Sequence, residues 1–245
     1  MLSETAAAIL EESKKYGWVL EPEAKRLFSD AGFDVPDFQW ARSEDEALDA
    51  GDRIGWPVVA KVISPGVIHK SEAEGVAVGI DGREAMREVF TRLSSIEGFD
   101  GVLVEEMLPG IELIIGGKID EQFGPVVLVG IGGIGVEIYK DTAIRMAPVT
   151  EKDVDPMLDD ITASSILRGY RGSEGVNLEK LKKLIADFSS LIVEMSDLVE
   201  SVDLNPVMCT EKRCVIADAR IILKKVTIDV DKANGSSLGF VQGKR

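Results

Sequence analysis

The sequence predicts a protein of mixed α/β class (α/β or α+β) with two subdomains, and three observations support this prediction. Helical patterns fill most of the first 54 residues. A β-branched run, PVVAKVI, then opens a stretch in which strands and a helix alternate. After Leu108, strand patterns follow one another with short turns, as in an antiparallel sheet. We place the boundary near Leu108-Pro109-Gly110, which gives subdomains 1–107 and 108–230 and a tail over 231–245.

Helices open the first subdomain. The periodicity predicts helices over residues 5–15, 22–32 and 44–54, and a short strand over residues 37–41. Pro22 suits a first helical turn, and Gly32 suits a helix end. Ser43, followed three residues later by Glu46, is a capping-box pattern.

Short apolar runs and helical periodicity predict the remaining elements. In the first subdomain, strands are expected over residues 57–63, 76–80 and 101–107, and a helix over residues 82–96. In the second, the expected strands cover residues 111–119, 124–132, 135–141, 142–149, 199–209 and 214–222. Its expected helices cover residues 151–158, 163–167 and 178–196.

Charge limits the classes of partner. The chain has 43 acidic and 28 basic residues, a formal net charge of −15, which repels phosphate backbones and anionic lipid over most of the surface. We therefore expect neither nucleic acid nor a membrane as a partner. The apolar stretches are too short to cross a bilayer, and the N-terminal segment carries acids where a signal peptide carries positive charge. The expected location is the cytoplasm.

Cys209 and Cys214 are the two cysteines of the chain, and the four residues between them indicate a hairpin turn. The thiols could face each other and oxidise, but in a cytoplasmic chain two reduced, half-buried thiols are favoured. The spacing and the lack of a nearby histidine argue against a zinc site.

Lys61 is the only charge in the PVVAKVI run, and a buried ammonium at that position needs an anion. The lysine could snorkel to water or pair with a carboxylate. Alternatively, the Ser-Pro-Gly loop after the strand offers backbone N–H groups for a ligand phosphate. His69, the only histidine, lies in this loop beside Lys70, and imidazole suits phosphoryl exchange near neutral pH. A lone loop histidine is, however, usually an exposed residue with no role.

The strand end at Glu105, Glu106, Met107 and Leu108 falls at the expected subdomain junction. Its backbone could hydrogen-bond an adenine edge while apolar side chains flank the ring, and Glu112 could accept hydrogen bonds from ribose hydroxyls. Acids at a strand end are commonly just solvated, so these residues alone leave both interpretations open.

Glycines recur between Gly130 and Gly135, which is reminiscent of a dinucleotide-binding fingerprint. The residues that follow, VEIYKD, predict a strand, whereas that fingerprint requires a helix, so we reject this interpretation. A hairpin, a bulge or the close approach of a phosphate are the remaining explanations.

Three hard oxygen groups are expected at one end of the last hairpin. Asp203 and Asn205 belong to the run Asp-Leu-Asn-Pro, and Asp218 follows thirteen residues after Asn205. Mg²⁺ is usually held by one or two such groups, with phosphates and water completing its shell. Asn-Pro is also a common turn starter, so a turn without metal is the alternative.

The order of these features resembles the ATP-grasp fold, in which two α/β subdomains clasp a nucleotide. More closely, the chain is similar over residues 20–223 to the beta subunits of ADP-forming acetyl-CoA synthetases. The runs that carry this resemblance are WPVVAKVISPGVIHKSEAEGVAVGI, VEEMLPGIELIIGG, GPVVLVGIGGIGVEIYKD, AIRMAPV and VDLNPV with ADARI.

The resemblance implies a ligase in which acyl-CoA, ADP and phosphate give acid, CoA and ATP through a phosphohistidine. It implies that His69 carries the phosphoryl group from a histidine of the alpha subunit to ADP. The remaining roles that it implies are phosphate contact for Lys61, adenine contact for Glu105 and Met107, ribose contact for Glu112, and Mg²⁺ coordination for Asn205 and Asp218.

The family also implies a CoA-binding alpha subunit as partner, in a hetero-tetramer of two alpha and two beta chains. Nothing in the sequence resembles a CoA-binding domain, so we expect an incomplete enzyme. Two other functions remain open: a stand-alone ATP-grasp ligase joining a carboxylate to an amine, which would not need His69, and a non-catalytic nucleotide-sensing module.

Overall fold

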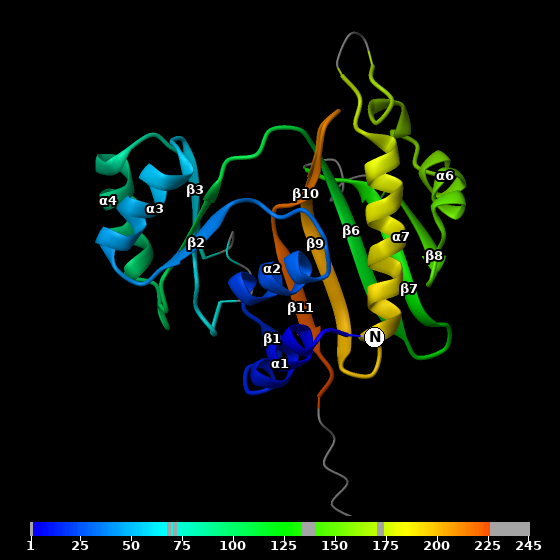
Figure 1. Ribbon diagram of the computed structural model, residues 1–245, viewed down its shortest axis with the longest axis horizontal. Coiled ribbons are helices and arrows are strands. Elements are labelled where there is room, and N and C mark those ends of the chain that lie inside the picture. The colour runs from blue at the N-terminus through cyan, green and yellow to red at the C-terminus, as the bar shows by residue number, and fades with distance from the viewer. Residues whose placement is uncertain (1, 68–69, 71–72, 134–140, 171–173, 226–245) are drawn as a thin grey trace, which may run out of the picture.

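The protein folds around two β-sheets that lie side by side, as the computed structural model in Figure 1 shows. The structure describes residues 2–67, 70, 73–133, 141–170 and 174–225. A four-stranded sheet occupies the left of the view and a seven-stranded sheet the right. The expected mixture of helices and antiparallel strands is confirmed.

The smaller sheet has the strand order β2-β5-β3-β4, with all neighbours antiparallel. Two helices cover one of its faces, and residues of alternate strand positions, such as Val58, Ala60 and Val62, pack against them. Ser43 caps the first of these helices by accepting a hydrogen bond from the Glu46 backbone, as expected. The elements are β2 (Phe38–Ala41), α3 (Glu44–Ile54), β3 (Val58–Val62), β4 (Val76–Ile80), α4 (Arg83–Ser94) and β5 (Val102–Glu106).

The larger sheet has the order β1-β11-β9-β6-β7-β8, and β10 pairs with β9 beside this path. Helices α6 and α7 lie over one face of its right-hand part (Figure 1). The strands are β1 (Trp18–Val19), β6 (Ile111–Asp120), β7 (Gly124–Ile131), β8 (Thr142–Met146), β9 (Val199–Cys209), β10 (Cys214–Ile216) and β11 (Ala219–Leu223). The helices are α6 (Glu151–Asp159), a single 3₁₀ turn (Ser164–Ile166) and α7 (Leu178–Glu194).

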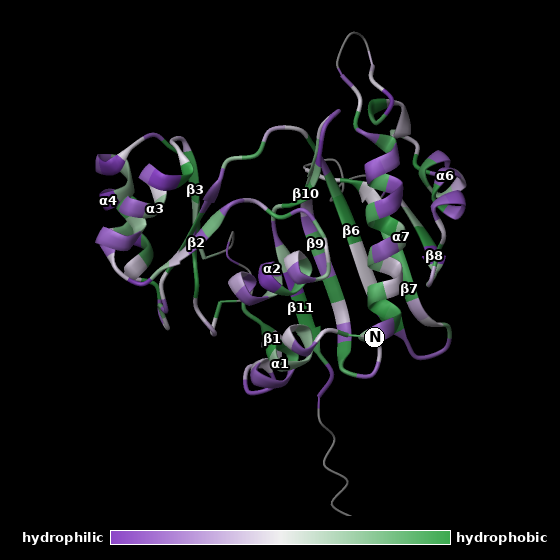
Figure 2. Cartoon of the chain, in the orientation of Figure 1, coloured by the Kyte–Doolittle hydropathy of each residue, from purple (hydrophilic) through white to green (hydrophobic). Residues whose placement is uncertain are grey.

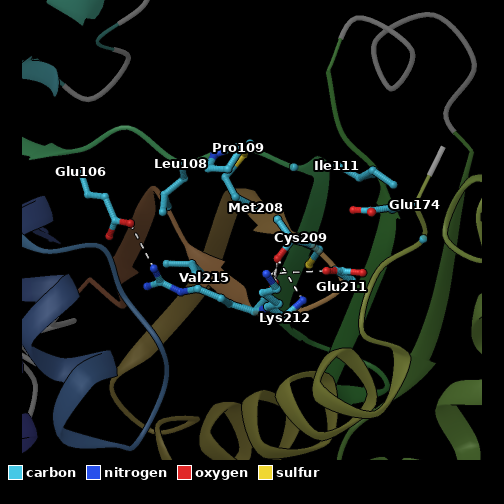
Figure 3. A pocket seen from close by; sticks show the side chains of 14 residues that line it. Glu106, Leu108, Pro109, Ile111, Glu174, Met208, Cys209, Glu211, Lys212 and Val215 are labelled. Atoms are coloured by element: carbon cyan, nitrogen blue, oxygen red, sulfur yellow. Dashed lines mark hydrogen bonds and ion pairs between the residues drawn. The ribbon is translucent and has the colours of Figure 1, made fainter. Parts of the chain in front are cut away.

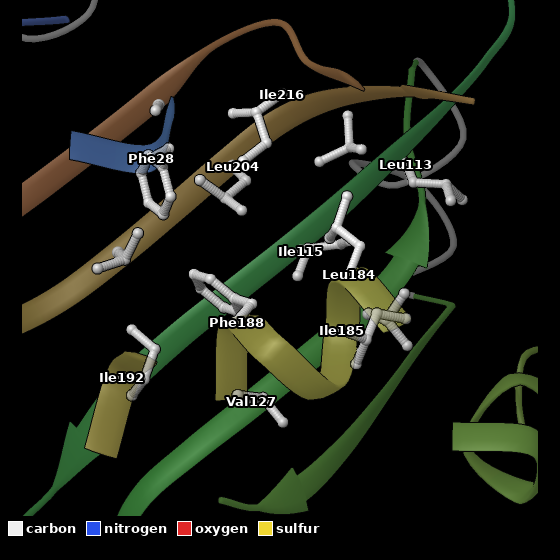
Figure 4. Packing of buried hydrophobic residues seen from close by; sticks show 14 of the residues in the cluster. Phe28, Leu113, Ile115, Val127, Leu184, Ile185, Phe188, Ile192, Leu204 and Ile216 are labelled. Carbon is white, nitrogen blue, oxygen red and sulfur yellow. The ribbon is translucent and has the colours of Figure 1, made fainter. Parts of the chain in front are cut away.

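The main core lies between α7 and the larger sheet (Figure 4). Ile185, Phe188 and Ile192 recur at helical spacing on α7, and they face strand residues that include Ile115. A Cβ on Gly117 would lie 2.6 Å from the side chain of Ile192, so a glycine is needed where the helix crosses β6. Figure 2 shows both hydrophilic (purple) and hydrophobic (green) residues along α7, as expected for an amphipathic helix that covers the sheet with one face.

The N-terminal helices α1 (Glu4–Ser13) and α2 (Glu21–Asp30) pack with the larger sheet. Between them, β1 pairs with β11, and Phe28 of α2 lies 6.4 Å from Phe188 between ring centroids. From the sequence we grouped residues 1–30 with the first half of the chain, because a strand of two residues leaves no periodic signal. The division into 1–107 and 108–230 as separate subdomains remains a prediction.

One expected strand is divided in the structure. The run 214–222 forms β10 and β11, separated by Ala217 and Asp218. The N–H groups of these two residues both donate to the carbonyl of Pro206, which bends the chain out of the regular ladder. The expected strand over 135–141 lies, except for Asp141, outside the described residues. Among the helices that the structure describes, none combines the length and the apolar composition needed to span a bilayer.

A small third cluster joins the two sheets. Trp18 and Leu20, from the β1 segment, pack with Ile63 and Leu103 of the smaller sheet. This apolar contact positions α2, which begins directly after it, against the uncovered face of the smaller sheet.

Candidate functional site

Lys61 lies on the face of the smaller sheet that turns away from its helices. Val58, Ala60 and Val62 point to the helices, so the period of two puts Lys61 on the opposite face. Only 7% of its side chain is exposed. The expectation of a charge buried in a strand is therefore confirmed.

Three oxygen atoms surround the ammonium of Lys61. Its Nζ lies 2.8 Å from Glu21 Oε1, 2.8 Å from Glu105 Oε1 and 2.8 Å from the carbonyl oxygen of Ala217. These partners come from α2, from β5 of the smaller sheet and from the segment between β10 and β11. In this structure Lys61 is paired with carboxylates, the first of the two interpretations that its sequence context allowed.

Glu21 is the centre of this cluster, because its carboxylate contacts three lysines. Oε1 lies 2.8 Å from Lys61 Nζ and 3.1 Å from Lys25 Nζ, and Oε2 lies 2.5 Å from Lys70 Nζ. Lys25 also forms an ion pair with Glu105. The side chains of Glu21 and Lys25 are fully buried.

These charges keep one another ionised. Burial alone would raise the pKa of the Glu21 carboxyl, but the charges of Lys61, Lys70 and Lys25 hold that pKa well below its usual range. Burial alone would lower the pKa of the Lys61 ammonium, but the neighbouring carboxylates, with Asp218 the strongest, raise it well above its usual range. Glu21 and Lys61 are therefore both charged at neutral pH.

Glu21 and Lys25 were not among the site residues predicted from the sequence. An acid and a lysine four residues apart on a helix are typical of an exposed surface pair. The signal available in the sequence is that residues 21, 25 and 28 share one face of the helix, and Phe28 is apolar. A charged pair on the apolar face of a helix indicates charges that will need buried partners.

Asn205 and Asp218 are neighbours, because the Asn205 N–H donates to the Asp218 carbonyl at 3.3 Å. The Asp218 carboxylate is partly exposed, and it lies 3.8 Å from Lys61 Nζ and 3.9 Å from Lys70 Nζ. Asp203, two residues before Asn205, pairs with Arg220 at 3.0 Å.

The donors at this position fit Mg²⁺. An amide oxygen and a carboxylate are hard ligands, and Mg²⁺ commonly takes one or two protein ligands together with phosphate and water oxygens. Within the described ranges, no group of three or more His, Cys, Asp or Glu side chains could hold a metal ion. A metal here would therefore depend on oxygens from a nucleotide, and the metal role of Asn205 and Asp218 remains a prediction.

The junction between the sheets begins where β5 ends. Glu105 is a central-strand residue that pairs with Phe38 on one side and Val59 on the other, and its carboxylate belongs to the lysine cluster. Met107 follows the end of the strand, with 43% of its surface exposed. If adenine binds at this junction, the backbone of Met107 and Leu108 is better placed to contact it than the Glu105 side chain.

A cavity of about 530 Å³ adjoins this junction (Figure 3). Leu108, Met208 and Val215 surround it with apolar groups, and Glu106 at its edge pairs with Arg213 at 3.1 Å. Its volume lies in the range of small-molecule sites. The cavity is not lined by the lysine cluster, but Val215 of its lining lies three residues before Asp218, whose carboxylate is 3.8 Å from Lys61 Nζ.

Glu112 is exposed on β6 and lies against the glycine-rich turn. The Gly132 N–H donates to the Glu112 carbonyl at 2.6 Å, and a Cβ on Gly132 would lie 2.9 Å from the Glu112 backbone. Close packing of backbone on backbone therefore explains the glycine at position 132, which sequence analysis left open.

His69 lies outside the described residues, although Lys70 beside it belongs to the cluster. Arg145 forms an ion pair with Asp160 at 2.5 Å, so it links β8 to the end of α6.

Cys209 and Cys214 are directly opposite each other on β9 and β10, as the expected hairpin requires. Both are free thiols and both are buried, rather than half-buried as expected. A hydrogen bond with Cys214, together with burial, raises the pKa of the Cys209 thiol above its usual range.

The two antiparallel sheets, with a buried lysine at one and hard oxygen donors at the other, define an ATP-grasp domain. The ATP-grasp family model matches residues 10–223 of the chain.

The curated relatives narrow the family. The chain is 41% identical over 227 residues to the acetate–CoA ligase [ADP-forming] I subunit beta of Pyrococcus furiosus, a match that covers 89% of the chain and 97% of that subunit. The chain belongs to the family of the beta subunits of ADP-forming acetate–CoA ligases. It is also 36% identical to acetate–CoA ligase [ADP-forming] I of Archaeoglobus fulgidus, a longer protein of which it spans 33%.

Solved structures agree with this membership. Acetyl-coenzyme A synthetase 1 of Ca. Korarchaeum cryptofilum, solved with coenzyme A, Ca-AMPCP and HgCl⁺, superimposes with a TM-score of 0.84 at 37% identity. This match covers 89% of the chain and 100% of the matched chain. The relative therefore holds a nucleotide analogue and a divalent cation in a structure of the same fold.

Proposed function

We propose that the chain is the nucleotide-binding subunit of an ADP-forming acyl-CoA synthetase. The reaction is acyl-CoA, ADP and phosphate giving acid, CoA and ATP, in either direction. The observation that carries the proposal is the 41% identity over 97% of the Pyrococcus beta subunit, which bears the name of this activity.

The described residues support a division of roles along the nucleotide. The adenine ring would lie in the cavity between Leu108, Met208 and Val215. Met107, which precedes Leu108 in the chain, would contact the adenine, and Glu112 would contact the ribose. The phosphates would then extend along the segment that leads to Asp218. Backbone groups after β5 and apolar side chains around them are the usual chemistry of an adenine site.

The phosphate end would be bound by the lysine cluster and a cation. Asn205 and Asp218 would hold Mg²⁺, which supplies charge neutralisation for the phosphoryl oxygens. Lys61 and Lys70 lie within 4 Å of the Asp218 carboxylate, so phosphate oxygens bound near that residue would be within reach of both ammonium groups. The buried Glu105 carboxylate, 2.8 Å from Lys61 Nζ, would hold that ammonium in place.

We propose His69 as the phosphoryl carrier on this chain. It is the only imidazole available, and it is adjacent in sequence to Lys70, whose ammonium is held by Glu21 and lies near Asp218. In its neutral form, the imidazole nitrogen takes a phosphoryl group from a donor histidine, and ADP then accepts that group to give ATP. Protonated imidazole cannot act as the nucleophile.

The partner that the proposal requires is a CoA-binding alpha subunit in the cytoplasm, in the expected arrangement of two alpha and two beta chains. Acetate–CoA ligase [ADP-forming] I of Archaeoglobus fulgidus is a longer protein, of which this chain spans 33%. This supports the proposal that CoA binding resides in a polypeptide segment other than this one. The identity of the acid would then be decided by the partner.

The test is reconstitution. The chain is mixed with its alpha partner, acetyl-CoA, ADP, phosphate and Mg²⁺, and ATP formation is followed with luciferase. ATP formed by the mixture, and by neither chain alone, supports the proposal. Tight binding of Mg-ADP without ATP formation from acetyl-CoA or other acyl-CoAs would favour a nucleotide sensor. ATP-dependent ligation of a carboxylate to an amine by this chain alone would favour the stand-alone ligase.

A further inference from the structure

Glu21 occupies a position that the proposed roles do not explain. Its carboxylate is fully buried, yet it contacts the ammonium groups of Lys25, Lys61 and Lys70, which come from α2, β3 and the loop after β3. We infer that Glu21 is a built-in counter-anion that makes nucleotide binding at this site depend on a divalent cation. This inference rests on the proposed phosphate contact of Lys61 and Lys70 and on the proposed metal role of Asp218.

The hydrogen-bond donors of Lys61 all have partners in this structure. An ammonium group has three N–H donors. Those of Lys61 are matched by three oxygens at 2.8 Å, from Glu21, Glu105 and the Ala217 carbonyl. A phosphate oxygen can therefore bind Lys61 only by replacing one of these partners or by sharing a donor with it.

The positive and negative charges of the cluster balance. Lys25, Lys61 and Lys70 face three carboxylates, those of Glu21, Glu105 and Asp218. Three positive and three negative charges leave the described cluster neutral. A neutral cluster attracts a nucleotide weakly, because the anion gains from the lysines what it loses to the carboxylates.

Coordination of a cation by Asp218 changes this balance. Once Asp218 coordinates the cation of Mg-ADP, its charge no longer offsets the two lysines that lie 3.8 and 3.9 Å away. The lysines would then exceed the two remaining carboxylates by one charge, which would favour a phosphate group beside them. Lys61 and Lys70 thus become receptive to phosphate when the nucleotide arrives with its cation.

Glu21 is the carboxylate on which this dependence rests. Glu105 contacts two of the three lysines, whereas Glu21 contacts all three, and its side chain has no exposed surface through which it could bind the ligand itself. Neutralising it gives the cluster an excess positive charge even when no cation is present. Glu21 therefore acts as a positioning residue that suppresses the binding of metal-free nucleotide and free anions.

The experiment is isothermal titration of the chain with ADP, once with Mg²⁺ and once with EDTA. Glu21→Gln keeps the shape of the side chain and removes its charge. We expect the wild type to bind ADP much more weakly in EDTA, and Glu21→Gln to raise the affinity for metal-free ADP about tenfold. The affinity for Mg-ADP should change much less, so the ratio of the affinity for Mg-ADP to the affinity for metal-free ADP should fall.

Glu23→Gln is the matched control, because it makes the same charge change on the same helix at a partly exposed residue that pairs with Arg26. It should leave both affinities unchanged. Lys25→Met makes the opposite change inside the cluster and should weaken binding of metal-free ADP further. If near-ultraviolet circular dichroism shows that Glu21→Gln does not fold, the affinity of Lys25→Met for metal-free ADP tests the inference instead.

The outcomes separate the inference from the function on which it rests. If the wild type fails to bind Mg-ADP, the proposed nucleotide site is wrong. If the wild type binds Mg-ADP but Glu21→Gln and Glu23→Gln have the same affinity for metal-free ADP, Glu21 is only structural and the inference is overturned. The inference is also overturned if Lys25→Met has the same affinity for metal-free ADP as the wild type.

Discussion

The ammonium of Lys61 lies 2.8 Å from the carbonyl oxygen of Ala217, although 156 residues separate them in sequence. Lys61 is in the smaller sheet, and Ala217 is in the segment that links β10 to β11 at the larger sheet. Because Asp218 is the next residue, this contact brings the predicted phosphate ligand and the predicted metal ligand together. The relative position of the two sheets is thus part of the site.

Replacing Lys61 tests whether it binds phosphate or only carboxylates. We expect Lys61→Met to lower the affinity for Mg-ADP at least tenfold, because the ligand loses a charged donor. The free energy of unfolding should also fall, by about 3–5 kcal/mol, since Glu21 and Glu105 lose a buried partner. Titration calorimetry and urea denaturation measure the two effects. Reduced stability with unaltered Mg-ADP affinity would assign Lys61 a structural role alone.

The predicted metal site is tested at Asp218. Asp218→Asn keeps an oxygen donor but removes the charge, so Mg²⁺ coordination should weaken. We expect the Mg²⁺ concentration that gives half-maximal ADP binding to rise about tenfold or more. Asp203→Asn is a useful comparison, because Asp203 pairs with Arg220 and was not assigned to the metal. An unchanged Mg²⁺ dependence in Asp218→Asn would count against the assignment.

The phosphocarrier role is tested at His69. We expect His69→Ala to abolish ATP formation by the reconstituted complex while leaving Mg-ADP binding nearly unchanged, because the nucleotide contacts lie on other residues. The luciferase assay and titration calorimetry report the two quantities. Phosphate transferred to the chain from labelled ATP should be acid-labile in the wild type and missing in the variant. Full turnover without His69 would exclude the carrier role.

Much of the fold could be predicted because its periodic signals are strong. The helix over 44–54 and the strand around Lys61 follow directly from amphipathic spacing and a β-branched run. Two features could not be read in this way. The two residues of β1 are too few to show a period, and the break between β10 and β11 depends on tertiary hydrogen bonds to Pro206.

Of the candidate site, the sequence pattern predicted Lys61 but not the charged residues that surround it. Lys61 stood out because a lone charge interrupts an apolar strand. Glu21 and Lys25 did not, because charged residues at helical spacing are ordinary on surfaces and only the packing of α2 against the smaller sheet buries them. Sequence alone gave the residue that needed an anion, and the structure was required to find the anion.

Acid should weaken the contribution of Glu21 to stability. Its pKa in the folded chain lies well below the ordinary value of 4.5, so its stabilising effect is fully present above that pH and is lost as the pH falls through the lower folded value. We expect the difference in unfolding free energy between wild type and Glu21→Gln to be large at pH 7 and to shrink below about pH 4.5. Urea denaturation at several pH values measures this difference. Glu23→Gln should show little difference at pH 7, because partly exposed ion pairs contribute little.

The packing of α7 should dominate the stability of the larger sheet. Phe188 is fully buried between α7, β6 and α2, where it contacts both the sheet core and Phe28. Truncation to alanine removes this apolar surface and leaves a cavity that a helix held along its length cannot close, so Phe188→Ala should cost about 3–5 kcal/mol. Phe123→Ala provides the matched control, because Phe123 is 58% exposed in a turn and its truncation should change the free energy of unfolding by under about 0.5 kcal/mol. If urea denaturation gives similar losses for both variants, the core assigned to α7 does not carry the stability of the larger sheet.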